Sequence, residues 1–244
     1  MGARSFVGDD DVAIELEGTN GAAAIGRVID AGARAKHLVG KRVLAGPVDP
    51  CGECDVCRRG GAAVCPTARR RSAPLESPIV CAARWLVTLG EPGGVDVPSP
   101  GGAVVAGDLA IAYTLYARTG VGPRDPVVVV GDSPIARHLV AVLRAKGITP
   151  GTDTDDVRAS FAEQGFGHRP WRVIATGPET VARAADLCGP RATLTVLAPV
   201  PTLPGELATR EVTVIPVAGA HPDLVTEIAA LVMKGELQIS VPDR

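Results

Sequence analysis

The sequence predicts an α/β protein in which a β-rich N-terminal domain precedes an open parallel sheet. Residues 1–102 carry short apolar or alternating runs between glycines and prolines, a pattern typical of turn-rich antiparallel structure. After residue 126, β-branched runs alternate with helical segments, which indicates right-handed βαβ units. Hydrophobic residues make up 46% of the 244 residues but aromatic residues only 3%, so the core must consist of Val, Ala, Leu and Ile. That mixture favours a parallel sheet covered on both faces.

The N-terminal domain is expected to contain four strands, separated by Gly and Pro residues. They are Val12–Leu16, Ala23–Asp30, Arg42–Ala45 and Val80–Leu89. The Pro- and Gly-rich stretch ending at Gly102 marks the expected boundary, so that the first domain covers residues 1–102 and the second residues 103–244.

The second domain is expected to begin with an apolar helix at Ala103–Thr119. The run Val127–Val130 predicts a strand buried on both faces, and Pro134–Lys146 predicts a helix with Asp132 or Ser133 as its N-cap. The further strands are expected at Thr149–Thr152 (interrupted by Pro150 and Gly151), Trp171–Ala175, Thr193–Ala198 and Val212–Val217, and the further helices at Asp155–Gln164, Glu179–Leu187 and Pro222–Lys234.

Charge and hydropathy exclude several classes of partner. The net charge is −2 with both signs interspersed, so neither nucleic acid nor an anionic membrane surface is expected to bind. No apolar run reaches the length that spans a bilayer, and Met1–Asp11 lacks the hydrophobic segment of a signal peptide. Clustered cysteines at metal-ligand spacing then favour a reducing, cytoplasmic setting.

Four of the six cysteines lie within fifteen residues, at the spacing C-x2-C-x2-C-x7-C: Cys51, Cys54, Cys57 and Cys65. Four thiolates suit a tetrahedral zinc ion at about 2.3 Å per Zn–S bond, a closed site that stabilises a loop and leaves no position for substrate. The alternatives are an iron–sulfur cluster, because Cys65 precedes a proline, or unliganded thiols, although a seven-residue gap fits the cluster poorly. Cys81 and Cys188 stand alone and are expected to be inert core residues.

A possible nucleotide turn follows the Val127–Val130 strand. It reads Gly131-Asp-Ser-Pro-Ile-Ala136, in which Gly131 and Ala136 match the G-x-G-x-x-G/A fingerprint while Ser133 replaces its second glycine. Asp132 places a negative charge where a diphosphate would lie. Asp153 follows Gly131 by 22 residues, where a carboxylate would bind the ribose 2′-OH and select NAD over NADP. Two interpretations stay open: a bound dinucleotide, or a sheet that has lost its pocket.

In order and spacing, several segments resemble the medium-chain, zinc-containing alcohol dehydrogenase family. They are Gly26–Gly32, Val39–Val43, Pro50–Cys54, Val80–Val87, Gly120–Gly131, Ile174–Gly177 and Val232–Leu237. The resemblance implies a GroES-like N-terminal domain with a structural zinc lobe at residues 50–66, and a Rossmann-type domain for NAD(H). It also implies a cofactor contact at Thr176 and a homodimer formed through the last strand, at Val212–Val217.

The departures from this family concern its catalytic zinc and its cofactor domain. The positions that resemble the zinc ligands hold Gly21-Ala22-Ala23 and Gly107, and the chain begins after the position of the first ligand, so we expect no catalytic zinc. Only residues 166–170 stand where the family has a further strand and helix, which would leave the weak second strand at the sheet edge. The chain is also expected to end without the family's final return to the first domain.

These observations support three hypotheses. The chain is a non-catalytic, zinc-stapled relative that binds a partner or a nucleotide, a zinc-independent NAD(P)H oxidoreductase, or a subunit of a larger assembly. In the second case Thr19, Asn20 or Tyr113 would donate a hydrogen bond to the substrate carbonyl, although their spacing singles out none of them.

Overall fold

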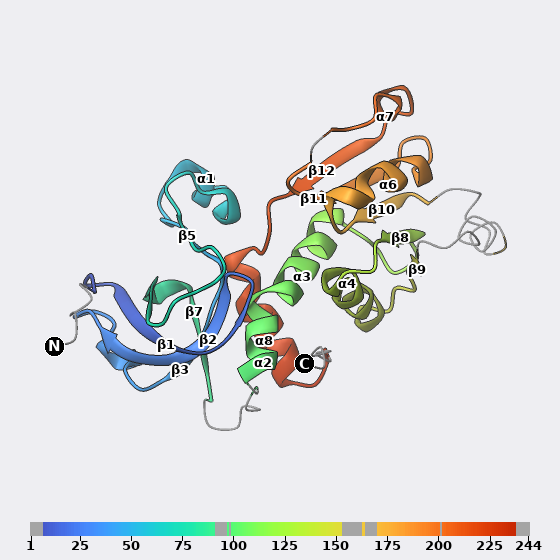
Figure 1. Cartoon of the computed structure of the whole chain (residues 1–244). Helices are drawn as coiled ribbons and strands as arrows, with labels where there is room; N and C mark the ends of the chain where they lie inside the picture. Colours follow the sequence, from blue (N-terminus) through green and yellow to red (C-terminus); the bar gives the residue numbers. More distant parts are fainter. Residues whose placement is uncertain are drawn as a thin grey trace. The chain divides into compact units, whose positions relative to one another are not determined.

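The computed structural model describes residues 7–90, 97, 99–152, 163, 170–200 and 202–237, and of residues 99 and 100 only the backbone. It divides the chain into two compact units (Figure 1). Unit 1 combines residues 1–110 with residues 220–244, and unit 2 contains residues 111–219. This division differs from the expected one at residue 102, and it assigns the C-terminal segment to the first unit.

Unit 1 is built on a five-stranded antiparallel sheet in the order β6-β1-β2-β3-β7. Its strands are β1 (Asp11–Asn20), β2 (Ala23–Ala31), β3 (Arg42–Ala45), β6 (Ile79–Ala82) and β7 (Leu86–Leu89). A two-residue turn joins β1 to β2, and Gly21 adopts the positive φ of 57° that the turn requires. Apart from Cys81, the buried side chains of this sheet's core cluster are aliphatic, as the composition predicts.

The expected strand at Val80–Leu89 is two strands, not one. A 3-10 turn at Ala83–Trp85 separates β6 from β7. The reason is topological, because β6 pairs with β1 whereas β7 pairs with β3 at the opposite edge of the sheet. The apolar run itself gives no sign that its two halves pair at opposite edges of the sheet.

The expected helix at Ala103–Thr119 is likewise divided, into α2 (Ser99–Ala106) and α3 (Asp108–Thr119). The break falls at Gly107, where an added Cβ would lie only 2.0 Å from Asn20 Oδ1. Asn20 also accepts a hydrogen bond from the Asp108 backbone N–H at 2.8 Å, and so caps the first turn of α3. The division therefore depends on a residue 88 positions away.

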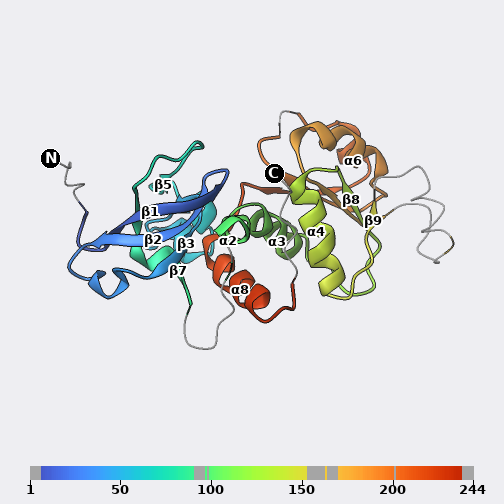
Figure 2. The same cartoon turned by 60° about the horizontal axis from the view of Figure 1, so that its bottom comes forward.

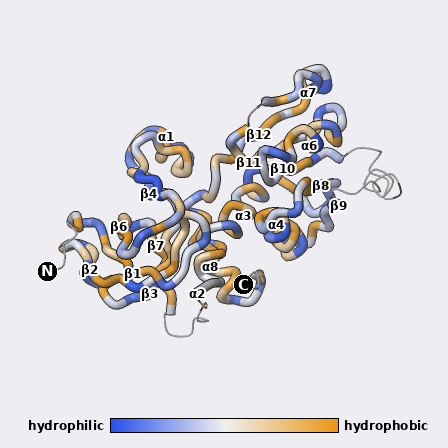
Figure 3. Tube along the Cα trace, in the orientation of Figure 1, coloured by the Kyte–Doolittle hydropathy of each residue, from blue (hydrophilic) through white to orange (hydrophobic). Residues whose placement is uncertain are grey.

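The C-terminal helix α8 (Pro222–Met233) corrects the expectation that the chain does not return to the first domain. It belongs to unit 1, where it contacts α2, β7 and the 3-10 turn at Ala62–Val64 (Figure 2). The helix is apolar along most of its length (Figure 3), and Pro222, Val225, Ile228 and Ala229 are its buried residues.

Unit 2 contains the expected parallel sheet, in the order β12-β11-β10-β8-β9. Its strands are β8 (Val127–Val130), β9 (Gly151–Thr152), β10 (Arg172–Ala175), β11 (Thr193–Leu197) and β12 (Thr213–Val217). All four residues of β8 are buried, which confirms that both faces of this strand are covered. The predicted fold class is confirmed.

The helices of unit 2 follow the expected pattern in the described part of the chain. They are α4 (Pro134–Ala145), α6 (Val181–Leu187) and the short α7 (Glu206–Thr209), in addition to most of α3. The two-residue β9 lies at the edge of the described sheet, as expected for an interrupted second strand. The helix expected at Asp155–Gln164 lies outside the described residues, apart from Glu163.

Candidate metal centre and nucleotide turn

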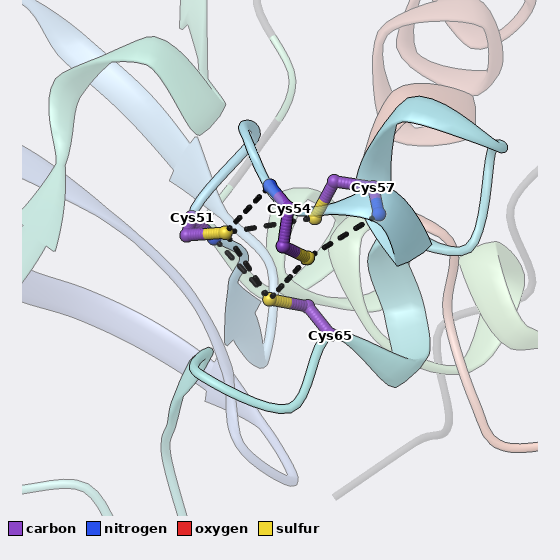
Figure 4. A group of neighbouring side chains, drawn as sticks. All are labelled: Cys51, Cys54, Cys57 and Cys65. Atoms are coloured by element: carbon purple, nitrogen blue, oxygen red, sulfur yellow. Dashed lines mark hydrogen bonds between the residues drawn. The ribbon is translucent and has the colours of Figure 1, made fainter.

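The four clustered cysteines converge on one point (Figure 4). Their sulfur atoms all lie within 4.8 Å of one another. The Sγ–Sγ distances are 3.6 Å for Cys65–Cys51, 3.9 Å for Cys54–Cys65 and 4.0 Å for Cys51–Cys57. A tetrahedron of sulfurs at about 2.3 Å from a central zinc has edges of about 3.8 Å. The cluster therefore has the size that a tetrahedral ion requires, and it can hold zinc.

Two short helical turns bring the cysteines together. Cys54 is the N-cap of α1 (Asp55–Arg58), and its sulfur accepts a hydrogen bond from the Cys57 backbone N–H. The chain then reverses at Gly60, which has a φ of 78°, and at Gly61, where a Cβ would lie 2.8 Å from Val56 Cγ1. The 3-10 turn Ala62–Val64 follows and delivers the fourth cysteine. The two glycines thus allow the seven-residue arm to fold back.

Hydrogen bonds to sulfur favour the thiolate form of two ligands. The Thr67 hydroxyl, followed by two backbone N–H groups, lowers the pKa of Cys51 to about 5. The backbone N–H of Cys51, with the Thr67 hydroxyl, also lowers the pKa of Cys65. Desolvation and the neighbouring sulfurs instead raise the pKa of Cys57 to about 12. A cation bound between the sulfurs would also favour the thiolate form of Cys57, because cysteines bind metal ions as thiolates.

A buried ion pair fixes the base of the lobe to the sheet. Asp49 ends the strand β4 (Val48–Asp49), which pairs with β5 (Arg69–Arg70). The Asp49 carboxylate accepts two hydrogen bonds of 2.9 Å from Arg71 and one of 3.0 Å from the Ala82 backbone N–H in β6. The Asp49 side chain is 2% exposed and that of Arg71 is 11% exposed. Such a bidentate pair is geometrically specific, although the buried Nε of Arg71 has no hydrogen-bond partner among the described residues.

Three further side chains fasten the lobe to the rest of unit 1. Trp85 Nε1 donates a hydrogen bond of 2.8 Å to the Pro50 carbonyl, and Arg84 donates to the carbonyl of Cys51. Arg69 donates two hydrogen bonds to the Asp11 carboxylate, at 2.6 and 2.9 Å, and this pairing lowers the pKa of Asp11. The lobe therefore rests on charged and aromatic contacts as well as on its own cysteines.

The predicted nucleotide residues fall at the ends of neighbouring parallel strands. Gly131 has a φ of 122°, and an added Cβ would lie 2.4 Å from Thr176 Oγ1. Thr176 is buried, and its hydroxyl donates to the Val130 carbonyl at 3.0 Å. Ser133 caps α4 by accepting from the Ala136 backbone N–H at 3.2 Å, and Ala136 is buried against the sheet. Asp153 lies outside the described residues.

A cavity of about 280 Å³ opens beside this turn. Gly131 and Ala136 line it together with Arg137, Val140, Arg144, Thr152 and Val129. Arg137 also donates to the Asp132 carbonyl at 2.5 Å. Two arginines thus border a partly apolar hollow next to the glycine turn, which is compatible with an anionic ligand, although Ser133 and Asp132 depart from the fingerprint.

A third polar arrangement lies at the end of β1, where the resemblance places zinc-ligand positions. Asn20 Nδ2 donates to Asp108 Oδ2 at 3.2 Å and Asn20 Oδ1 accepts from the Asp108 N–H, so the two residues form a bridge over Gly107. Ala23, at another of these positions, is buried and carries no ligand atom. Among the residues that the structure describes, the four-cysteine cluster is the one group of three or more His, Cys, Asp or Glu side chains close enough to share a metal ion.

The two remaining cysteines are buried, as expected for core residues. Cys81 and Cys188 are both 0% exposed and neither forms a disulfide. Burial raises the pKa of Cys81 to about 12, so this thiol is protonated at neutral pH and unsuited to act as a nucleophile.

A GroES-like antiparallel unit with a four-cysteine lobe, and a Rossmann-type parallel unit with a glycine turn, define the architecture of the medium-chain dehydrogenases. The relatives of this chain confirm the predicted resemblance to the zinc-containing members of that family. L-arabinitol 4-dehydrogenase of Aspergillus oryzae is 31% identical over 146 residues, and 2-dehydro-3-deoxy-L-galactonate 5-dehydrogenase of Pseudoalteromonas atlantica is 29% identical over 131 residues. These matches cover 57% and 52% of this chain but only 37% of either relative, so the matched part is little more than a third of their length. No family model matches the chain.

Solved structures show the same fold over nearly the whole chain. Alcohol dehydrogenase TADH from Thermus sp. ATN1 has a TM-score of 0.78 at 16% identity, covering 98% of this chain and 86% of that one. A short chain alcohol dehydrogenase from Escherichia coli CFT073, complexed with NADH, has a TM-score of 0.74 at 17% identity, covering 96% and 83%. A zinc-binding dehydrogenase from Sinorhizobium meliloti 1021, bound to NADP, has a TM-score of 0.72 at 18% identity, covering 96% and 84%.

Several residues of the lobe's surroundings were missed by the sequence analysis. Asp49 directly precedes the Pro50-Cys51 pair, and Arg71 ends a run of three arginines, so both stood close to the motif. Thr67 lies two residues beyond the last ligand. His221 donates to the lobe from 161 residues away, and nothing in the sequence signals that contact. In the described part of the chain no helix combines the length and the apolarity needed to cross a bilayer.

Proposed function

We propose that this chain is a zinc-stapled, dehydrogenase-like protein that works without a catalytic zinc. The observation that carries this proposal is the Asn20–Asp108 bridge packed over Gly107. A ligand side chain at position 107 would collide with Asn20, and the alanines at positions 22 and 23 offer no ligand atom. The polar groups near these positions are instead bonded to each other.

The sulfur cluster supports a structural role for the one metal that we propose. Cys51, Cys54, Cys57 and Cys65 supply four donors, so a zinc ion bound there would have a complete tetrahedron and no open coordination position. Such an ion contributes folding energy and does not polarise a substrate. We also propose a reducing, cytoplasmic setting, because all six thiols are free and zinc thiolates persist where disulfides do not form.

The test combines metal analysis with a substrate screen. We expect about one zinc per chain, held by thiolates in an X-ray absorption spectrum, and no NAD(P)-dependent oxidation of polyols or alcohols. A second zinc with nitrogen or oxygen ligands, or zinc-dependent turnover of a polyol, would refute the proposal. As a control for substituting a cluster cysteine, Cys188→Ser should keep its zinc, because Cys188 lies outside the cluster and its sulfur donates to the Ala184 carbonyl.

A zinc-independent NAD(P)H oxidoreductase is the second candidate. The cavity beside Gly131 and the two arginines that border it support nucleotide binding, as do the NADH and NADP complexes among the structural neighbours. If Asp153 accepts the ribose 2′-OH, NADH will bind more tightly than NADPH. Titration with each nucleotide, monitored by nicotinamide fluorescence, decides this point: tight binding favours the second candidate, and a screen of carbonyl and enone substrates would follow.

A homodimer through β12 is a further proposal that concerns assembly. β12 is an edge strand of the described sheet, in which Thr213 and Pro216 are exposed, Val214 and Ile215 are half-buried and Val217 is buried. An edge of this kind presents free backbone groups to a partner strand. Sedimentation of the wild type and of Thr213→Lys would test it, since Thr213 is exposed and a charge on that edge should favour the monomer.

A further inference from the structure

His221 connects the zinc lobe to the C-terminal helix. Its Nε2 lies 2.8 Å from the carbonyl oxygen of Gly60, which is in the arm between the ligands Cys57 and Cys65. A carbonyl oxygen only accepts hydrogen bonds, so Nε2 must carry the proton. The other ring nitrogen lies 3.7 Å from Asp223 Oδ2, and the side chain is 16% exposed. The imidazole is therefore held between the lobe and α8.

His221 stands at the start of the segment that returns to unit 1. It is the N-cap residue of α8, and Pro222 begins the helix with a fixed φ. Beyond this point α8 packs on α2 and β7 and also touches the Ala62–Val64 turn of the lobe. The lobe thus supplies one wall of the site in which α8 docks.

The Gly60 carbonyl is held in place by the lobe's own folding. Gly60 donates its N–H to the Cys57 carbonyl at 2.9 Å, and Gly61 donates to the Val56 carbonyl at 2.8 Å. Both ends of this arm are zinc ligands, so an ion that joins Cys57 to Cys65 restricts where the carbonyl can lie. Without that restraint, the arm is held by its local hydrogen bonds, by Arg70, which donates to the Ala63 carbonyl, and by its contacts with His221 and α8.

We propose that metal occupancy of the lobe and docking of α8 are energetically coupled, with His221 as the positioning residue between them. The inference rests on the proposed structural zinc but goes beyond it, because it assigns the lobe a partner within the same chain. Coupling is reciprocal, so the docked helix must also retain the metal. His221 acts through the Gly60 carbonyl and is not itself a ligand.

Hydrogen exchange of the full-length protein tests one direction of this coupling. After zinc content has been measured, amide exchange in residues 222–233 is compared in the zinc-loaded protein and after treatment with a zinc chelator. We expect protection of α8 to fall by about tenfold on zinc removal, within the usual range of coupling. The strands β8, β10 and β11 serve as the internal reference and should not change. Equal protection of α8 in both states would overturn the coupling.

Zinc release tests the other direction. We expect His221→Ala to release zinc to a chromogenic chelator several-fold faster than the wild type, and His221→Gln, whose amide N–H can donate to Gly60, to restore most of the retention. His37→Ala is the matched control, because His37 is exposed in the 3-10 turn at Lys36–Leu38 of the same unit. A wild-type release rate in His221→Ala would refute the role of His221.

The outcomes separate this inference from the proposal on which it rests. A wild-type protein that binds no zinc would contradict both. A zinc-loaded protein whose α8 is indifferent to the metal would contradict the coupling alone. If His221→Ala does not fold, the exchange comparison in the wild type still decides whether the metal and α8 are coupled.

Discussion

The proposed zinc lobe takes its four candidate ligands from fifteen consecutive residues, whereas the nucleotide turn takes its predicted residues from the ends of β8 and β10 and from a sequence position beyond β9. In the lobe, each sulfur is placed by a local turn, and the donor set is complete. In the nucleotide turn, Gly131 keeps its close approach to Thr176 and Ala136 keeps its packing, but Ser133 holds a cap where the fingerprint has a glycine. The cysteines of the lobe are brought together by local turns, whereas the nucleotide turn needs segments that only the folded sheet brings together.

Removing one lobe ligand is expected to have the largest effect. Cys54→Ser should lower the zinc content from about one per chain to less than about 0.1, because structural zinc binding supplies about 10–16 kcal/mol in small peptides. Residues 50–66 should then exchange their amides rapidly, while the parallel sheet keeps its protection. Mass spectrometry gives both measurements. Full zinc content in Cys54→Ser, with Cys188→Ser as the control, would mean that the four-cysteine assignment is wrong.

Breaking the buried pair beneath the lobe is expected to rank second. Asp49→Ala leaves Arg71 charged and without its carboxylate, and removes the acceptor of the Ala82 N–H. We expect a loss of about 3–5 kcal/mol in the unfolding free energy of unit 1, measured in urea. The control is Asp10→Ala, whose exposed pair with Arg34 should contribute less than about 1 kcal/mol. Equal losses of unfolding free energy in the two variants would show that burial does not make the Asp49 ion pair more stabilising than an exposed one.

Placing a glycine at the second position of the fingerprint tests whether the nucleotide turn binds a cofactor. Ser133→Gly removes the side chain that separates a pyrophosphate from the backbone, and should raise the affinity for NADH by roughly tenfold if the turn binds the cofactor. The loss of the serine cap should cost only a few tenths of a kcal/mol. Isothermal titration measures the affinity, and thermal unfolding measures the cost. No NADH binding to either protein would count against a working cofactor site.

Removing the charge of Asp11 should have the smallest effect, a pH-dependent change in the stability of unit 1. Arg69 lowers the folded pKa of Asp11 below its ordinary value of 3.8. A lowered carboxyl pKa contributes stability above the unfolded pKa, and that contribution is lost as pH falls through the folded value. The stability difference between the wild type and Asp11→Asn should therefore be constant above about pH 5 and shrink below it. A difference that stays constant down to pH 2 would exclude this ion pair as its source.

Sequence reasoning identified the parallel strands, the cysteine cluster and the family resemblance because each depends on short-range pattern. Val127–Val130 is a run of four β-branched residues, and the cysteine spacing predicts that the four sulfurs lie close together. Sequence reasoning was wrong where contacts between distant residues determine where a helix or strand ends. The break at Gly107 follows from Asn20, and the crossing at Ala83–Trp85 follows from which strands pair.

By itself, the sequence determined which residues can bind metal, since sulfur spacing and glycine placement act over a few bonds. Only the tertiary structure decided that α8 belongs with the first unit, that Asp49 and Arg71 lie beneath the lobe, and that His221 reaches Gly60. Those contacts join residues 22 to 161 positions apart, and their free energy comes from burial and hydrogen bonding that exist only after the chain has folded.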